Sequence, residues 1–238
     1  MRNIRPSLSI SVFALLMLCA GPASARFLQT DPVGYKDDVN LYEYAKDDPV
    51  DHTDPSGKDS FEVSRTITEA GFNTPYDHTF TIVSDKPGGA IRASFDYGPQ
   101  NGGSGNLING TNGKLVSTGL TSTDAAAWKA SQSPNSGVRI EKIPASDPAV
   151  IAAGQSLNKT LGTAANPGNI DYAHSPNGTN VSGNSNSATS TLVNNAVQAT
   201  HPGAPNVNPP AGSNAPGSSV RITSPNCVSG PGGSSCKM

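Results

Sequence analysis

Residues 78–97 read HTFTIVSDKPGGAIRASFDY, and this stretch decides the fold. Its second half, 91–97, places apolar side chains at every other position, which is typical of a half-buried β-strand. Its first half carries the apolar run Phe80, Ile82 and Val83 after His78. The Pro-Gly cluster at 86–89 between the two halves is a turn signal. We therefore predict a β-hairpin in which 78–84 pairs with 90–97.

Further elements follow on both sides of this hairpin. Phe61 and Val63 alternate with polar residues, as do Val138 and Ile140, so each pair marks a short strand. Three segments have helical spacing or start signals: 125–130 capped by Thr123 or Asp124, a helix capped by Asp147 with Pro148 at its first position, and 187–199. Together these patterns predict an α+β fold, with a small antiparallel sheet packed with about three helices and joined by long loops.

The composition limits how large the core can be. Only 34% of the residues are hydrophobic and 5% aromatic, and the chain contains 25 glycines and 20 prolines. Residues 201–238 are rich in Pro, Gly, Ser and Asn, and we predict that this segment is a disordered tail. Within it, Cys227 and Cys236 either pair in an oxidising compartment or remain two free thiols. The net charge of −2 without a basic patch argues against nucleic-acid binding.

The first 25 residues have the pattern of a secretory signal peptide. Arg2 and Arg5 precede an apolar run over 10–20, and Gly21-Pro22 leads into Ala23-Ser24-Ala25. The apolar run is shorter than the roughly 20 residues that a stable membrane span needs. We therefore expect a secreted or periplasmic protein with no stable membrane span.

Residues 26–58 form a second, polar segment that is rich in Asp, Tyr and Pro. Its short motifs are Arg26-Phe27, Asp31-Pro32-Val33-Gly34, Asn40-Leu41-Tyr42-Glu43-Tyr44, Asp48-Pro49 and Asp54-Pro55-Ser56-Gly57. This pattern over 26–57 closely resembles the C-terminal end of the RHS-repeat-associated core. The departures are Asp48, where that family usually has Asn, and Lys58, where it usually has an apolar residue.

The RHS resemblance implies an organisation for the rest of the chain. In that family a shell of tyrosine-containing β-repeats is closed by the core segment, and a variable effector or toxin domain follows, often after aspartate-dependent self-cleavage. Asp31 and Asp54 match the motif aspartates, but the shell is absent here, and Asp-Pro-x-Gly is also an ordinary turn signal. By this resemblance 59–200 is an effector-like domain, and an RHS shell protein or a cognate immunity protein would be its partner.

Two motifs within 59–200 point to a hydrolase. His78 opens a predicted strand, and Asn184-Ser185-Asn186-Ser187 stands just before the last predicted helix. A histidine at the head of a strand, followed by a nucleophile at a helix start about a hundred residues later, resembles circularly permuted papain-like enzymes. These include NlpC-type peptidases and lecithin-retinol acyltransferase. The resemblance assigns His78 as the base and Ser185 as the nucleophile, in place of cysteine. We expect Asp96, on the facing strand, to orient the histidine.

This chemistry has a physical basis and a plainer alternative. A helix N-terminus offers unpaired N–H groups that stabilise an oxyanion, and a serine nucleophile needs a histidine within reach. Alternatively, Ser185 and its neighbours are only good helix caps and His78 only a sheet residue. We expect no cofactor and no metal site, because no cysteine lies near the histidines. The sequence thus predicts an exported RHS-family effector or toxin-like fragment that hydrolyses amide or ester bonds, or else a non-catalytic secreted remnant or binding module that docks to an RHS shell.

Overall fold

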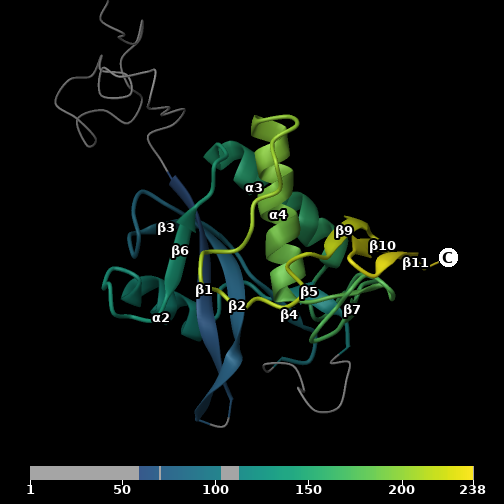
Figure 1. Cartoon of the computed structure of the whole chain (residues 1–238), viewed down its shortest axis with the longest axis horizontal. Coiled ribbons are helices and arrows are strands. Elements are labelled where there is room, and N and C mark those ends of the chain that lie inside the picture. Colours follow the sequence, from purple (N-terminus) through teal and green to yellow (C-terminus); the bar gives the residue numbers. More distant parts are fainter. Residues whose placement is uncertain (1–58, 70, 103–112, 238) are drawn as a thin grey trace, which may run out of the picture. The chain divides into compact units, whose positions relative to one another are not determined.

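The computed structural model describes residues 59–69, 71–102 and 113–237 (Figure 1). The chain divides into two units, Met1–Gly57 and Lys58–Met238, and all the helices and strands that the structure describes belong to the second. The predicted signal peptide, the RHS-like segment and its aspartates Asp31 and Asp54 lie outside the described residues. The described part contains three helices and small antiparallel sheets, which confirms the predicted α+β class.

A four-stranded sheet with the order β3-β2-β1-β6 forms the centre of this unit. Its strands are β1 (Asp59–Glu69), β2 (Phe72–Ser84), β3 (Ile91–Phe95) and β6 (Arg139–Lys142). The predicted hairpin is confirmed, since Thr81 pairs with Phe95 and Val83 with Ala93. β2 begins earlier than predicted and makes a long antiparallel hairpin with β1 (Figure 1).

One face of this sheet is apolar and is covered by α2 (Ser122–Ala130). The buried residues that meet there are Phe61, Val63, Phe80, Ile82, Ala127 and Trp128. Trp128 packs its ring 5.6 Å from that of Phe61 and donates a hydrogen bond from Nε1 to the Gly89 carbonyl. The N-cap of α2 is Thr121, so the predicted caps Thr123 and Asp124 were wrong by two and three positions. Asp124 instead lies in the first turn of the helix.

The opposite face is polar around the middle of β1 and β2 and is covered by α4 (Ser185–Thr200). Glu62 is 2% exposed there and is paired in register with Thr81. Burial raises the pKa of Glu62 to about 8, although Arg221 lowers it and Glu141 raises it further. Among the described residues, Glu62 Oε1 and Thr81 Oγ1 have no hydrogen-bond partner. A protonated Glu62 therefore suits this layer better than a carboxylate.

α4 lies in the interior instead of on the surface. Twelve of its residues are buried, most of them Ser, Thr, Asn and Ala, whose small side chains let neighbouring elements approach closely. Its N-cap is Asn184, which forms a capping box with Ser187. The helix therefore starts two residues before the predicted 187. The small hydroxyl and amide side chains bond to backbone groups around the helix, so burial leaves few of them unsatisfied.

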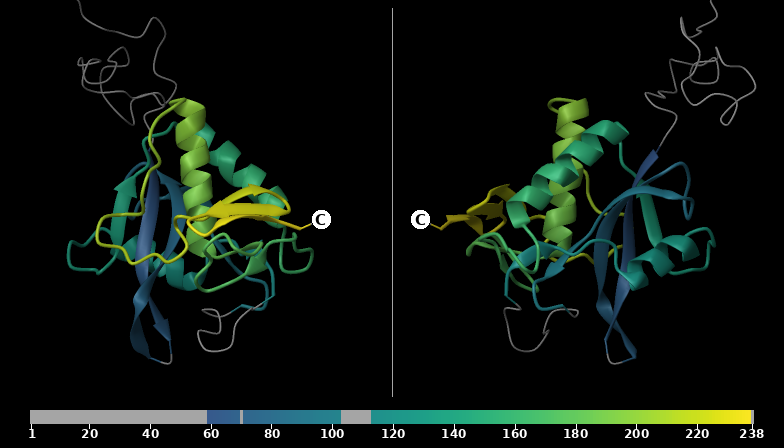
Figure 2. Two further views of the ribbon diagram at one scale, coloured as in Figure 1. Left: turned by 45° about the vertical axis from the view of Figure 1, so that its right-hand side comes forward. Right: turned by 180° about the vertical axis from the view of Figure 1, so that it is seen from behind.

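α3 (Asp147–Leu161) packs against α4 and completes the larger core (Figure 2). Its N-cap is Ser146 and not the predicted Asp147, which instead accepts hydrogen bonds from Ser60 and Arg92. Gly154 is required in this helix: a Cβ atom at this position would lie 2.4 Å from the ring of Phe95. The glycine weakens the helix but permits close packing on β3.

The prediction of a disordered tail over 201–238 was wrong for the part that the structure describes. This segment forms a three-stranded sheet, β11-β10-β9, from β9 (Arg221–Ser224), β10 (Cys227–Gly230) and β11 (Gly233–Cys236). Val220, Ile222 and Val228 are buried in the larger core. Cys227 and Cys236 form a disulfide across β10 and β11, the first of the two alternatives. A few apolar side chains and one cross-link thus order a segment whose composition is otherwise polar.

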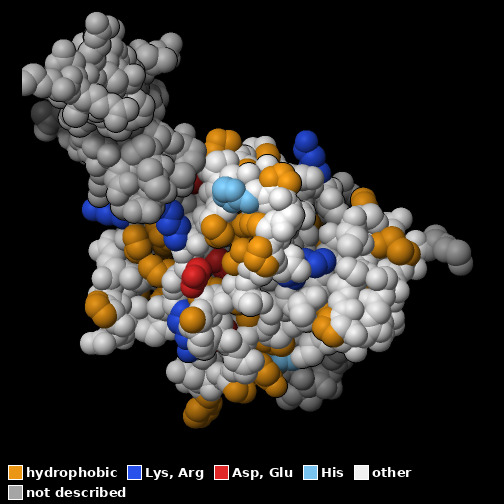
Figure 3. All heavy atoms as spheres, turned by 45° about the horizontal axis from the view of Figure 1, so that its top comes forward, with side chains coloured by type: hydrophobic (Ala, Val, Ile, Leu, Met, Phe, Trp, Pro, Cys, Tyr) orange, Lys and Arg blue, Asp and Glu red, His pale blue; other side chains and the backbone are white. Residues whose placement is uncertain are grey.

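Two strand pairs and the loops complete the unit. β4 (Tyr97–Pro99) pairs with β5 (Leu115–Ser117), and β7 (Asp171–Tyr172) runs parallel to β8 (Ser182–Gly183). On the face drawn in Figure 3, Lys and Arg side chains are spread singly. None of the helices in the described part is long and apolar enough to cross a membrane.

Replacing both cysteines of the disulfide by serine is expected to lower the free energy of unfolding by about 2–3 kcal/mol, because the cross-link closes a short loop in the unfolded chain. The two residues are nine positions apart. Denaturant unfolding of the oxidised protein against Cys227→Ser/Cys236→Ser measures this difference. The reduced wild type should match the double variant; a reduced protein as stable as the oxidised one contradicts the prediction.

Candidate functional site

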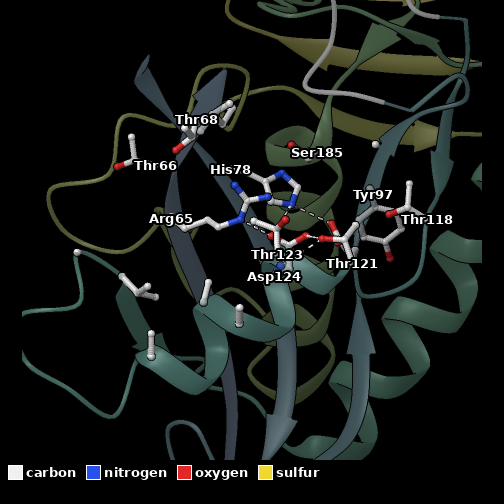
Figure 4. Close-up of a pocket in the computed structure, with 18 of the residues that line it drawn as sticks. Arg65, Thr66, Thr68, His78, Tyr97, Thr118, Thr121, Thr123, Asp124 and Ser185 are labelled. Carbon is white, nitrogen blue, oxygen red and sulfur yellow. Dashed lines mark hydrogen bonds and ion pairs between the residues drawn. The ribbon is translucent and has the colours of Figure 1, made fainter. Parts of the chain in front are cut away.

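A pocket of about 740 Å³ lies between the β1–β2 hairpin, α2 and the start of α4 (Figure 4). His78, Asp96 and Ser185, the three residues that the sequence singles out, all line it. They come from β2, from the link between β3 and β4, and from the first position of α4. The fold therefore brings together residues that are 18 and 107 positions apart in the chain.

His78 is held by a hydrogen bond to a buried carboxyl group. Its Nε2 lies 2.9 Å from Asp96 Oδ1, and the Asp96 side chain is 1% exposed. The imidazole stacks on Phe80, with ring centroids 5.8 Å apart. In the tautomer whose Nε2–H donates to Asp96 Oδ1, Nδ1 carries no proton and can act as a base.

Asp124 and Arg65 also belong to the site, and neither was predicted. Asp124 Oδ1 lies 3.7 Å from His78 Nε2 and accepts a hydrogen bond from Arg65 Nε, while Thr121 donates to the other oxygen of Asp124. In the sequence Asp124 has the pattern of a helix-capping residue. Arg65 lies on β1 and is paired in register with His78 on β2. This neighbour can be identified only once the pairing of β1 with β2 is known.

The two carboxyl groups beside His78 have pKa values that are shifted in opposite directions. Burial raises the pKa of Asp96, and the nearby His78 offsets this only in part. Burial also acts to raise the pKa of Asp124, but His78 and Arg65 outweigh it and the pKa is lowered. Asp124 is therefore the first of the pair to ionise as the pH rises.

The same three side chains could offer ligands to a metal ion. Ligand atoms of His78, Asp96 and Asp124 lie within 4.8 Å of one another. However, Arg65 and Thr121 already donate to the two oxygens of Asp124. The guanidinium supplies the positive charge that a cation would otherwise bring.

Ser185 stands at the N-terminus of α4 and is 6% exposed. In Figure 4 it lies on the opposite side of the imidazole from Asp124. Within the described residues, its hydroxyl makes no hydrogen bond, and none joins it to His78. Catalytic hydrogen bonds are often long or poorly aligned in sites without substrate, and they tighten when substrate binds.

The first turn of α4 offers unpaired backbone donors. The N–H of Ser187 bonds to the Asn184 side chain, whereas those of Ser185 and Asn186 donate to none of the described residues. Such groups at a helix N-terminus can stabilise negative charge on the oxygen of a carbonyl group bound beside them.

The chain matches no protein family model, no curated protein and no solved structure.

Proposed function

We propose that the described unit is a serine-dependent hydrolase of amide or ester bonds. Ser185 is the nucleophile, His78 the general base, and Asp96 the group that orients the imidazole. The observation that carries the proposal is that these three residues line one pocket and that His78 Nε2 lies 2.9 Å from Asp96 Oδ1. A triad is recognised by such roles and geometry and not by chain order.

The reaction follows from the positions of these groups. His78 Nδ1 takes the proton of the Ser185 hydroxyl while the oxygen attacks the substrate carbonyl carbon. The N–H groups of the first turn of α4 stabilise the resulting oxyanion. Collapse of the tetrahedral species breaks the bond to the leaving group, which receives the proton from His78. Water then attacks the acyl-enzyme in the same way, which releases the acid and restores Ser185.

The lining of the pocket favours an uncharged acyl group. Its charged side chains are Arg65, His78, Asp96 and Asp124, and these four contact one another. The remaining lining contributes mainly hydroxyl groups and small apolar side chains: Thr66, Ile67, Thr68, Thr118, Thr121, Thr123, Ala126, Ala127, Ala130 and Val138. A substrate with a free carboxylate or phosphate in this pocket would find no unpaired cation among these residues.

In the wider context, we propose that this hydrolase is an effector or toxin-like domain of an exported RHS-family protein. The signal-like pattern of 1–25 and the RHS-like motifs of 26–57 support this context. An RHS shell protein or an immunity protein would then be its partner, and the secreted or periplasmic space its location.

The purified protein is expected to react with a fluorophosphonate probe at Ser185. Ser185→Ala and His78→Ala should each abolish labelling, because one removes the nucleophile and the other its base. Ser187→Ala is the matched control. Ser187 lies two residues further along α4 and outside the pocket lining, so its loss should cost about 1 kcal/mol of stability and leave labelling intact.

One result would reject the hydrolase and another would reject Ser185 as its nucleophile. Absence of labelling in a folded wild type that also leaves a panel of uncharged p-nitrophenyl esters intact would favour a non-catalytic binding module. Labelling that survives Ser185→Ala would place the reactive hydroxyl elsewhere.

A further inference from the structure

The side chain of Asn186 connects the strand that carries His78 to the helix that carries Ser185. Asn186 directly follows Ser185 and is 3% exposed. Its Oδ1 accepts from the backbone N–H of Thr79 at 2.9 Å and from the Thr79 hydroxyl at 3.0 Å, and its Nδ2 donates to the Asp77 carbonyl at 2.9 Å. Asp77 and Thr79 are the two neighbours of His78 in β2, so one amide binds the backbone on both sides of it.

The strand edge that Asn186 binds is not covered by β3. β3 pairs with β2 from Thr81 onward, which leaves the backbone groups of Asp77 and Thr79 without a strand partner on that side. Side chains and a loop replace the strand: the Asp77 N–H donates to the Asn214 carbonyl, and the Thr79 carbonyl accepts from Thr189 of α4. The edge of β2 beside His78 is thus docked onto α4, with Asn186 making the central contacts.

The loop that follows α4 closes this arrangement from the other side. Asn186 Nδ2 also donates to the Pro216 carbonyl at 3.2 Å, and the cap residue Asn184 donates to the same carbonyl at 2.8 Å. Asn214 returns two hydrogen bonds to β2, from its N–H to Asp77 Oδ2 and from Nδ2 to the Pro75 carbonyl. Residues 214–216 therefore join the start of α4 to the strand of His78.

We infer that Asn186 is a positioning residue that sets the distance and orientation of the Ser185 hydroxyl relative to the His78 imidazole. The inference rests on the proposed function and adds to it. The immediate chain neighbours of both reactive groups are joined by two hydrogen bonds of 2.9 Å, in a buried interface where such bonds are well defined. A displacement of about 1 Å between reacting groups can cost on the order of 100-fold in rate.

The same helix offers a matched control in Asn194. This residue lies eight positions later, is 4% exposed, and uses its amide in the same way: Nδ2 donates to Ser190 and Val207 carbonyls, and Oδ1 accepts from the Val207 N–H. Like Asn186 it is buried and uses both amide atoms, but its hydrogen bonds go to Ser190 and Val207 and not to β2.

The experiment compares Asn186→Ala with Asn194→Ala in the full chain, at a temperature where denaturant unfolding shows both to be folded. Fluorophosphonate labelling is measured over a range of probe concentrations, which separates the maximal rate constant from the concentration that gives half of it. We expect Asn186→Ala to lower the maximal rate constant by about 100-fold with little change in the half-saturating concentration. Asn194→Ala should remain within a few-fold of the wild type in both.

A second readout does not depend on activity. In protein labelled with ¹³C and ¹⁵N at histidine, the imidazole signals of His78 should broaden or split in Asn186→Ala, and should stay as in the wild type in Asn194→Ala. Equal labelling rates and unchanged His78 signals in both variants would overturn the inference while leaving the hydrolase in place. A wild type that does not react with the probe would reject the hydrolase, and the His78 signals would still decide whether Asn186 fixes the imidazole.

Discussion

Asp96→Asn is expected to slow fluorophosphonate labelling of Ser185 by on the order of 10³-fold at alkaline pH, and by far less at acidic pH. The reason is the raised pKa of the buried Asp96 carboxyl. Below that pKa the wild type has a neutral acid, which the amide resembles in shape and charge. Above it the wild type has a carboxylate that stabilises the imidazolium formed during attack, and the amide cannot replace this charge.

The ratio of the wild-type rate to the Asp96→Asn rate, followed from pH 4 to 9, tests this prediction. Taking the ratio removes the titration of shared groups that do not contact Asp96. Asp124→Asn is the control: the pKa of Asp124 is lowered, so its carboxylate is charged over the whole range. Its rate ratio should therefore stay constant with pH. A constant ratio for Asp96→Asn, or a rising one for Asp124→Asn, would exchange the roles of the two carboxyl groups.

Stability distinguishes lost chemistry from lost structure. A carboxyl group whose pKa is raised by folding holds its proton more tightly in the folded state, so the protein loses stability as the pH rises through that range. Asp96→Asn removes this loss and should unfold no more easily than the wild type at alkaline pH. If Asp96→Asn is less active but equally stable, the Asp96 carboxylate serves the reaction at a cost to the stability of the fold.

Glu62→Gln is expected to stabilise the protein strongly at alkaline pH. Folding raises the pKa of Glu62 from 4.5 to about 8, so the folded state binds one more proton than the unfolded state between these values. The wild type therefore loses unfolding free energy over that window, by on the order of 5 kcal/mol in total. Glutamine keeps the shape of the protonated acid and does not titrate, so the variant should not lose it.

Denaturant unfolding of both proteins at pH 5 and pH 9 measures this effect as the change in their stability difference. Glu141→Gln is the matched control, since Glu141 lies opposite Glu62 in register on β6 but is exposed. The stability difference between the wild type and Glu141→Gln should change only slightly from pH 5 to pH 9. Parallel stability curves for the wild type and Glu62→Gln would show that Glu62 stays charged in the folded protein, with Arg221 as its partner.

The sequence predicts those parts of the fold whose signals are local. The hairpin of β2 and β3 follows from alternation around Pro87-Gly88, and α3 from a proline in its first turn. The pairing of β1 with β6 joins segments about 80 residues apart, and no local pattern encodes it. That residues 201–237 are ordered was missed because composition reports the mean polarity, whereas three buried side chains and a disulfide suffice here.

The candidate site divides in the same way. Ser185 stands at the start of α4 and His78 at the start of the predicted strand, although the observed β2 begins six residues earlier. Both could be found from their motifs, and Asp96 follows from the predicted hairpin. Asp124 satisfies the local rules for a helix start, so its contact with His78 is hidden behind a more ordinary role. Asn186 likewise reads as part of a helix start. Its partners lie in β2, and only the docking of α4 on that strand brings them together.

The pocket depends on residues 214–216, which are synthesised after every residue that lines it. The strand of His78 leaves the ribosome more than a hundred residues before the carbonyl group of Pro216 that binds the cap and first turn of α4. A nascent chain that already contains His78, Asp96 and Ser185 therefore still lacks the contacts that hold their elements together. In the proposed hydrolase, this chain order would delay activity until residues 214–216 have been synthesised and have folded onto α4.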